Sequence, residues 1–238
     1  MSNSHLPVDR ILVKISGESL KGSSSEVIDP DELKRVAQDI ADVVNNDTQV
    51  VIVVGAGNIW RGANHHEINQ SDADYLGMTA TIINGGALGS ALKGLGVETR
   101  VMTALPIDKV CEPYLFRRAI RHLEKGRVVI CVAGTGNPFC TTDFTAALRA
   151  AELECDVIYM GKNGVDGVYD SDPRTNEDAV RFHELTFREI IDRGLEVMDM
   201  TAITQAGDKG IPIVVYNGNK PGALSEVIYN SKHGTVIR

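Results

Sequence analysis

The chain has 238 residues, with 24 Lys and Arg against 32 Asp and Glu, and its formal net charge is −8. This acidity argues against a dominant nucleic-acid surface and against an acidic membrane as partner, so any anionic ligand must be captured by a local site. No apolar run reaches the roughly 20 residues that span a bilayer. The start, MSNSHLPVDR, lacks the basic and apolar parts of a secretory signal.

The cysteines indicate neither a disulfide framework nor a zinc site. They lie far apart, with no Cys-x-x-Cys pair and no histidine at zinc-finger spacing. Reduced thiols in a cytoplasmic protein are therefore expected. The four residues are Cys111, Cys131, Cys140 and Cys155.

Short apolar runs alternate with amphipathic stretches along the chain. Strands are predicted at 11–15, 49–54, 98–102, 127–132, 156–160 and 211–216. Helices are predicted at 30–45, 72–93, 113–125, 142–153, 187–193 and 201–209. Surface loops are expected at 21–30 and 64–74, and a long connection at 168–182. The pattern predicts one domain, 1–238, with an α/β fold: a three-layer α/β/α sandwich with a mainly parallel central sheet.

Two turns rich in small residues follow the first two predicted strands. Lys14 and the following ISGES bring an ammonium beside exposed backbone N–H groups, as in a phosphate cradle. The second strand ends in GAGNIWRGA, where Arg61 adds a forked cation. Trp60 excludes a dinucleotide fingerprint there, and no Walker loop occurs in the chain. A surface lysine and a simple tight turn are the alternative interpretations.

The segment AGTGNPFCTTDFTAALRA, residues 133–150, offers hydroxyls, an amide and free N–H groups. Such groups suit a nucleotide that is recognised by neutral hydrogen bonds. Pro138 and Phe139 add an apolar wall for a flat base, and Asp143 stands at the start of the next predicted helix. The polar residues are Thr135, Gly136, Asn137, Thr141 and Thr142.

Three further positions carry polar chemistry. Asp74 begins a helical stretch and either caps that helix, which the motif alone favours, or accepts hydrogen bonds from ribose hydroxyls. The segment GKNGVDGVYDSDP, 161–173, has the glycines, Tyr169 and acids of an adenine and ribose pocket. VMDMTA places Asp199 at a helix start.

Six motifs of the chain, in this order, closely resemble the bacterial uridylate kinase family of the amino-acid kinase superfamily. They are Lys14 with SGE, GAGNIWRG, AGTGNPFCTTD, KNGVDGVYDSDP, VMDMTA and NGNKPGAL. The resemblance covers nearly the whole chain. GTGNPFCTTD is its most specific part, because other members of the superfamily share the lysine and glycine turns but not this segment. The resemblance implies an amino-acid-kinase-like fold and phosphoryl transfer from MgATP to UMP, giving UDP and ADP in pyrimidine nucleotide biosynthesis.

The resemblance also implies residue roles. ATP is expected against Lys14, Ile15, Ser16, Gly17, Gly57, Arg61, Asn163, Tyr169 and Asp172. UMP is expected against Ala56, Asp74, Thr135, Gly136, Asn137, Pro138, Phe139, Cys140, Thr141 and Thr142. Three residues are expected to be catalytic: Lys14 would stabilise the β- and γ-phosphates, Arg61 would bridge donor and acceptor, and Asp199 would orient Lys14 or metal-bound water. Mg²⁺ is expected to bind with ATP and to have few protein ligands, so no metal ligand is named.

The chain departs from the family pattern at Ala56, where glycine is common; this is harmless if the backbone N–H is the contact. Around Asn163 the family varies in length, and this chain has the longer form, MGKNGVDG. Selection of uracil over cytosine is expected from the backbone of 136–139 and the Thr142 hydroxyl.

The resemblance implies a homohexamer, built through the Gly- and Ala-rich helix at 74–92, unless those small residues pack inside one subunit. GTP and UTP are expected as effectors, acting through 21–30 and the region 93–120. The physical motive is a local cationic set in an acidic protein, Arg100, Arg117, Arg118 and Arg121, for which solvated surface charge is the alternative. Two rival functions are a kinase of the same superfamily that phosphorylates a carboxylate or carbamate, and a non-catalytic nucleotide-binding or oxyanion-storage protein.

Overall fold

One sheet of nine strands organises this computed structural model, which describes residues 9–65, 67–195, 197–229 and 234–238. Its order is β4 (Glu112–Pro113), β3 (Thr99–Thr103), β5 (Val128–Val132), β2 (Gln49–Val54), β1 (Arg10–Ile15), β6 (Val157–Lys162), β8 (Ile213–Asn217), β9 (Thr235–Ile237) and β7 (Glu184–Leu185). Neighbouring strands are parallel, except that β8 and β9 are antiparallel. The predicted absence of a secretory signal concerns a segment whose residues 1–8 lie outside the described residues.

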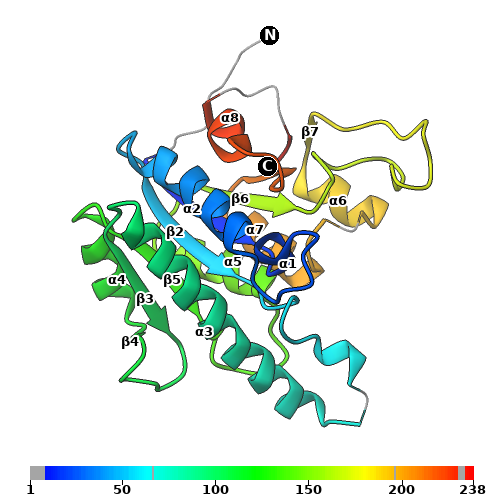
Figure 1. Cartoon of the computed structure of the whole chain (residues 1–238). Helices are drawn as coiled ribbons and strands as arrows, with labels where there is room; N and C mark the ends of the chain where they lie inside the picture. The colour runs from blue at the N-terminus through cyan, green and yellow to red at the C-terminus, as the bar shows by residue number, and fades with distance from the viewer. Residues whose placement is uncertain (1–8, 66, 196, 230–233) are drawn as a thin grey trace.

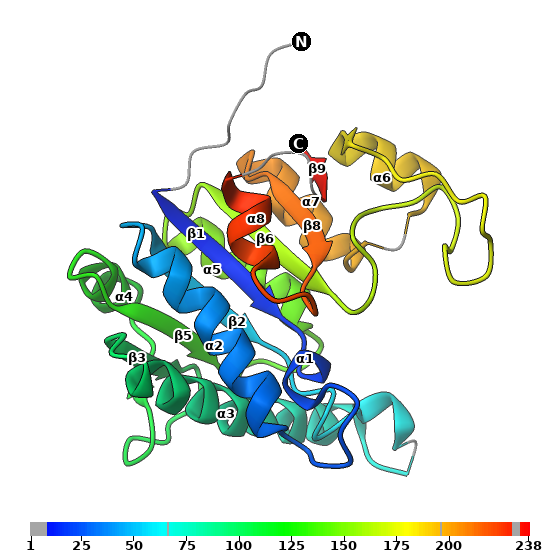
Figure 2. The ribbon, with the colours of Figure 1, turned by 45° about the horizontal axis from the view of Figure 1, so that its top comes forward.

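Helices cover both faces of the sheet (Figures 1 and 2). One face carries α2 (Pro30–Val44), α3 (Gln70–Gly94) and α8 (Ala223–Tyr229), and the other α4 (Phe116–Leu123), α5 (Thr142–Glu152), α6 (Phe187–Arg193) and α7 (Met200–Lys209). Along β1, Ile11 and Val13 enter the core under α2, whereas Leu12 enters the core under α5. Because both faces are buried, the strands are apolar at almost every position, and the predicted three-layer sandwich is confirmed.

All six predicted strands and six predicted helices occur, with ends shifted by a few residues. The structure also has short elements that the sequence pattern did not predict: the strands β4, β7 and β9 and the helices α1 (Glu18–Lys21), η1 (Gly62–Asn64) and α8. Elements of two to seven residues are too short to show a hydrophobic period. The segment between β6 and β7 contains no helix or named strand, as predicted, and extends away from the sheet in Figures 1 and 2.

Helix α3 begins earlier than predicted and lies very close to the sheet. Asn69 caps it by accepting a hydrogen bond from the N–H of Ser71, so Asp74 is inside the helix and does not cap it. A Cβ at Gly85 would overlap the side chain of Val132, and one at Gly89 would lie 2.9 Å from Val101 Cγ2. These two glycines therefore pack inside the subunit, against β5 and β3.

Within the described residues, no helix combines the length and the apolar character needed to cross a membrane.

Candidate active site

The carboxyl ends of β1, β2, β5 and β6 lie at one edge of the sheet. Lys14 on the central strand β1 is in register with Val53 of β2 and Met160 of β6, and Val53 is in register with Cys131 of β5. The four turns that follow these strands carry most of the predicted site residues. In parallel α/β sheets this edge is where ligands bind.

Lys14 forms an ion pair with Asp143 at this edge. Lys14 Nζ lies 2.6 Å from Asp143 Oδ1, and the two side chains are 15% and 19% exposed. Asp143 is in the first turn of α5, where the helix dipole favours a carboxylate. Asp199 was predicted to orient Lys14 or metal-bound water; the carboxylate that pairs with Lys14 in this structure is that of Asp143.

Lys162 is a second cation beside this ion pair. It is the last residue of β6. Burial lowers the pKa of its ammonium group, the nearby Asp143 raises it, and Lys14 lowers it. Lys162 was not predicted as a site residue, although it stands at the carboxyl end of a buried strand and Lys14 stands one residue before such an end. Two lysines and one carboxylate leave a net positive charge, which suits phosphate oxygens.

The turns after β1 and β2 pack tightly on each other. Ile15 ends β1, and its carbonyl accepts a hydrogen bond from the N–H of Gly55. Ser16 Oγ accepts one from the N–H of Glu18. A Cβ at Gly17 would overlap the Asn58 side chain and lie 3.0 Å from the Gly57 nitrogen. Glycine is therefore required for this close approach, which leaves a narrow backbone-lined turn.

Arg61 lies across the second turn. Its Nη2 donates to Glu18 Oε1 at 2.6 Å, and its Nε donates to the carbonyl of Gly57 at 3.1 Å. The Arg61 side chain is 57% exposed, so it can still turn toward a ligand. Glu18, its partner, was not among the predicted site residues.

The acceptor loop, defined here as residues 133–141 after β5, has an unusual backbone. The Thr81 hydroxyl accepts a 2.7 Å hydrogen bond from the N–H of Ala133, and Asp74 Oδ2 accepts one of the same length from the N–H of Phe139. Both bonds come from α3 and fix the loop in a conformation that L-residues rarely adopt. The residues with positive φ are Ala133 (61°), Gly134 (57°), Gly136 (81°) and Phe139 (64°).

Asp199 contacts the far end of the acceptor loop. It caps α7 by accepting a hydrogen bond from the N–H of Ala202, and it also accepts from the hydroxyls of Thr141 and Thr201. Thr141 in turn caps α5. Burial by itself raises the pKa of the Asp199 carboxyl, but these hydrogen bonds outweigh it and hold the pKa below its usual value. Asp199 is therefore an anion that ties α7 to the acceptor loop.

A cavity of about 340 Å³ lies between α3, the turn after β2 and the acceptor loop. Trp60, Met78 and Thr81, which the sequence analysis did not select, also line it. The predicted UMP residues that line it are Ala56, Asp74, Cys140, Thr141 and Thr142, together with the predicted ATP residue Gly57.

The middle of the acceptor loop extends beyond this cavity. The Thr135 hydroxyl accepts from the N–H of Asn137, and a Cβ at Gly136 would lie 3.0 Å from the carbonyl oxygen of Ala104. Pro138 follows, and Phe139 is 71% exposed. Of the predicted apolar wall, Phe139 is thus open to solvent, whereas Pro138 is half-buried.

A second cavity, of about 420 Å³, lies between the end of β6 and the β6–β7 segment. Lys162 lines it, and so do the predicted ATP residues Tyr169 and Asp172. Tyr169 donates to Asp166 Oδ1 at 2.6 Å, a hydrogen bond that raises the pKa of the phenol. The carbonyl of Asn163 accepts from Arg174, another lining residue. Lys162 therefore connects this cavity to the Lys14–Asp143 pair.

A mainly parallel sheet with two cavities and two lysines at its carboxyl edge is the arrangement of a phosphotransferase of the amino acid kinase class. The sequence profile of the amino acid kinase family matches residues 9–217. A uridylate kinase of Streptococcus thermophilus is 49% identical over 96% of this chain and 94% of its own. The chain therefore belongs to the amino acid kinase family, and within it to the uridylate kinases.

Solved structures agree. The UMP kinase of Ureaplasma parvum is 42% identical, with a TM-score of 0.93 over 98% of this chain and 99% of its own. The UMP kinase of Bacillus anthracis is 36% identical, with a TM-score of 0.94 over 98% of this chain and 96% of its own.

Proposed function

We propose that this protein transfers the γ-phosphoryl group of ATP to UMP, giving ADP and UDP, in pyrimidine nucleotide biosynthesis. The observation that carries the proposal is the Lys14–Asp143–Lys162 group, which lies between a cavity lined by the acceptor motif and a cavity lined by the donor motif. In-line transfer needs positioning and neutralisation of charge rather than a covalent intermediate.

The two lysines supply the positive charge for the moving group. Asp143 holds the Lys14 ammonium through the 2.6 Å ion pair, so Lys14 is already in position when a phosphate binds. Lys162 reaches the same region from β6 and lines the donor cavity. Arg61, released from Glu18, bridges the donor and acceptor phosphates. Backbone N–H groups of residues 15–17 and of Gly57 complete the phosphate site.

Mg²⁺ accompanies ATP in this proposal. Among the described residues, no group of three or more His, Cys, Asp and Glu side chains is placed to hold a metal ion. The carboxylates of Asp143 and Asp199 fit an ion that keeps water and phosphate oxygens as most of its ligands, and they would orient its bound water. When bound, Mg²⁺ neutralises charge on the β- and γ-phosphates.

In this proposal UMP binds in the 340 Å³ cavity and against the adjoining acceptor loop. Asp74 accepts hydrogen bonds from the ribose, Arg61 binds the phosphate, and the backbone of 136–139 with the Thr142 hydroxyl reads the uracil edge. Uracil and cytosine exchange donor and acceptor at two ring positions, so a site that pairs with one leaves polar atoms unpaired with the other. Each mismatch costs about 1–3 kcal/mol.

A homohexamer is proposed as the assembly, with α3 in its interface. Gly85 and Gly89 are used inside the subunit, but Gly86 has open space above it. The apolar side chains that α3 exposes are Tyr75, Leu76 and Ile83. A monomeric mass in light scattering at micromolar concentration would contradict the hexamer.

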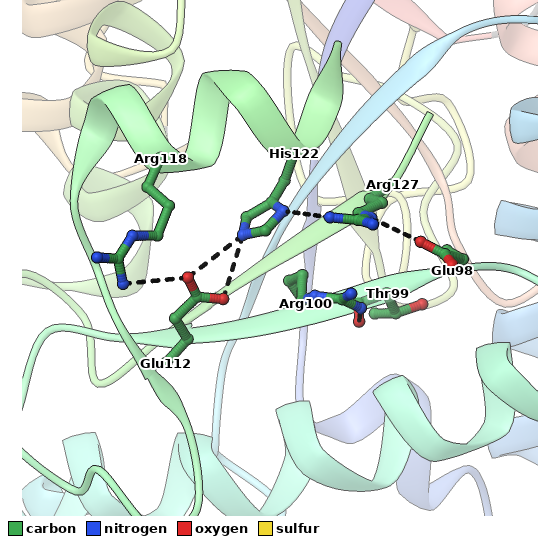
Figure 3. A network of polar contacts seen from close by, with 7 residues as sticks. All are labelled: Glu98, Thr99, Arg100, Glu112, Arg118, His122 and Arg127. Carbon is green, nitrogen blue, oxygen red and sulfur yellow. Dashed lines mark hydrogen bonds and ion pairs between the residues drawn. The ribbon is translucent and has the colours of Figure 1, made fainter. Parts of the chain in front are cut away.

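GTP and UTP are proposed as effectors that act through the loop 21–30 and the region 93–120, which includes the start of α4. In Figure 3, Glu112 of β4 contacts Arg118 and His122 of α4, and Arg127 links His122 to Glu98. A cavity of about 420 Å³ lies over the same helix, lined by Leu115, Phe116, Arg117, Arg118 and Arg121. Activity and ATP half-saturation that stay constant across GTP and UTP titrations would remove this proposal.

Residues 1–238 are proposed to act as one domain in the cytoplasm, without a nucleic-acid or membrane partner. One sheet connects the two cavities, which supports a single functional unit. All four cysteines are free thiols, which fits a reducing compartment.

The proposed reaction is tested by coupled measurement of ADP release with MgATP and one acceptor at a time. UMP should give turnover, whereas carboxylate and carbamate acceptors should give the rate seen without acceptor. A protein that binds both nucleotides but releases no ADP would be the non-catalytic alternative. A matched control is the Lys14→Ala variant, which should bind UMP and ATP and turn over slowly.

A further inference from the structure

Arg149 of α5 is a buried cation that the proposed chemistry does not use. The residue is 5% exposed. Its Nη1 donates to Glu152 Oε2 at 2.6 Å, and its guanidinium carbon lies 3.8 Å from the centre of the Tyr114 ring. The Tyr114 hydroxyl donates to the same Glu152 oxygen at 2.7 Å. Two side chains, those of Glu152 and Tyr114, thus fix the plane of the Arg149 guanidinium.

The other arm of Arg149 reaches the acceptor loop. Its Nη2 donates to the carbonyl of Gly134 at 3.2 Å. Gly134 lines the acceptor cavity and has a φ of 57°. The residue before it, Ala133, is held through its N–H by Thr81. The left-handed start of the acceptor loop is therefore fixed from α3 on one side and from Arg149 on the other.

Tyr114 connects the Arg149–Glu152 pair to a second segment of the chain, the one that contains Thr103 and Ala104. Tyr114 directly follows β4, and its N–H donates to the carbonyl of Thr103 at 2.9 Å. The carbonyl of Ala104, the next residue, lies against Gly136 of the acceptor loop. Burial, with the hydrogen bond to Glu152, raises the pKa of the Tyr114 phenol, which therefore remains a neutral donor.

We propose that Arg149, oriented by Tyr114 and Glu152, is a positioning residue for the acceptor nucleotide: it fixes the Gly134 carbonyl and so the shape of the loop that receives UMP. The inference rests on the proposed function, because it assigns the acceptor to the cavity that Gly134 lines. Lysine could not replace this arginine, since a single ammonium lacks the rigid fork that serves Glu152 and Gly134 together.

The test compares Arg149→Lys with a matched control, Arg10→Lys. Arg10 also donates to a backbone carbonyl, that of Leu153 at 2.6 Å, but it lies at the opposite end of β1. Arg149→Lys should raise KM for UMP about tenfold, because a hydrogen bond from a charged group is lost. KM for ATP should stay at the wild-type value. Arg10→Lys should leave both KM values unchanged, whatever it does to the melting temperature.

Binding can be followed without turnover. Trp60 is the only tryptophan of the chain and lines the acceptor cavity, so its fluorescence reports UMP binding in the absence of ATP. Arg149→Lys should weaken that binding by the same factor. If this variant does not fold, Tyr114→Phe keeps the ring and removes the bond to Glu152, and it should raise KM for UMP alone, by about threefold.

An unchanged KM for UMP in a folded Arg149→Lys or Tyr114→Phe variant would overturn the role of Arg149, as would an equal rise of both KM values. Wild-type protein without UMP-dependent ADP release would instead overturn the proposed function. The two failures are therefore distinguishable.

Discussion

Asp74→Ala removes the carboxylate that holds Phe139 in its left-handed conformation. The bond from the Phe139 N–H to Asp74 is 2.7 Å long, and φ of Phe139 is 64°. A hydrogen bond to a charged group contributes about 1.5–3 kcal/mol, and a left-handed conformation costs a non-glycine residue about 1–2 kcal/mol. The bond thus offsets the strain, and without it Phe139 should relax to negative φ.

UMP binding must then restore the strained loop. That cost of about 1–2 kcal/mol corresponds to a rise of roughly five- to thirtyfold in KM for UMP. Coupled ADP release measures it, with Trp60 fluorescence as the binding assay. The second variant, Phe139→Gly, separates loop shape from any direct contact between Asp74 and the ribose, because glycine adopts positive φ without strain.

In the Asp74→Ala background, Phe139→Gly should recover about threefold or more of the lost affinity for UMP. The single variant Phe139→Gly is the reference for this comparison: Phe139 is 71% exposed and packs little inside the subunit, and any rise in KM for UMP that comes from losing its expected contact with the base appears in this single variant. No recovery in the double variant would refute the reasoning that Asp74 acts through the backbone of Phe139.

Three further variants test the site. Lys14→Ala should lower kcat by about 10²–10³-fold with both nucleotides still bound, measured by turnover and equilibrium binding; loss of binding instead would contradict its role. Thr142→Val should raise KM for UMP about tenfold and leave KM for ATP unchanged, and equal changes in both would count against uracil reading. Because burial lowers the pKa of Lys162 from the usual value of a lysine, its ammonium is lost at a lower pH than that of an exposed lysine, so kcat/KM for ATP should fall as the pH rises through the lowered pKa. Lys162→Arg should move this fall to higher pH, since guanidinium stays charged, and an unmoved limb would exclude Lys162 as its cause.

Local sequence patterns predicted the central elements well, because each long strand is buried on both faces and the helices α2, α5 and α7 have a periodic apolar side. Helix α3 is apolar almost all round and was found from its length and composition rather than from a period. These patterns did not predict very short elements such as β9. They also misplaced the start of a helix whose N-cap is an amide side chain when a carboxylate follows a few residues later. Asn69 caps α3, but Asp74 was chosen because a carboxylate before an apolar stretch resembles a cap.

The partners of the site residues depend on tertiary structure. Lys14 and Asp143 are far apart in sequence and meet only because β1 lies beside the start of α5. Lys162 could have been selected from its place at a strand end. The contact of Arg149 with Gly134 could not, because an arginine inside a helix is ordinarily solvated, and its burial follows from the packing of α5 on the sheet.

The most direct test of the account is the ratio of kcat/KM for UMP to that for CMP, measured by ADP release with the wild-type protein at saturating MgATP. Two unpaired polar contacts with cytosine predict a preference for UMP of roughly a hundredfold or more. Similar efficiencies for the two nucleotides, or a preference for CMP, would contradict the assignment of the acceptor loop as a uracil-reading site.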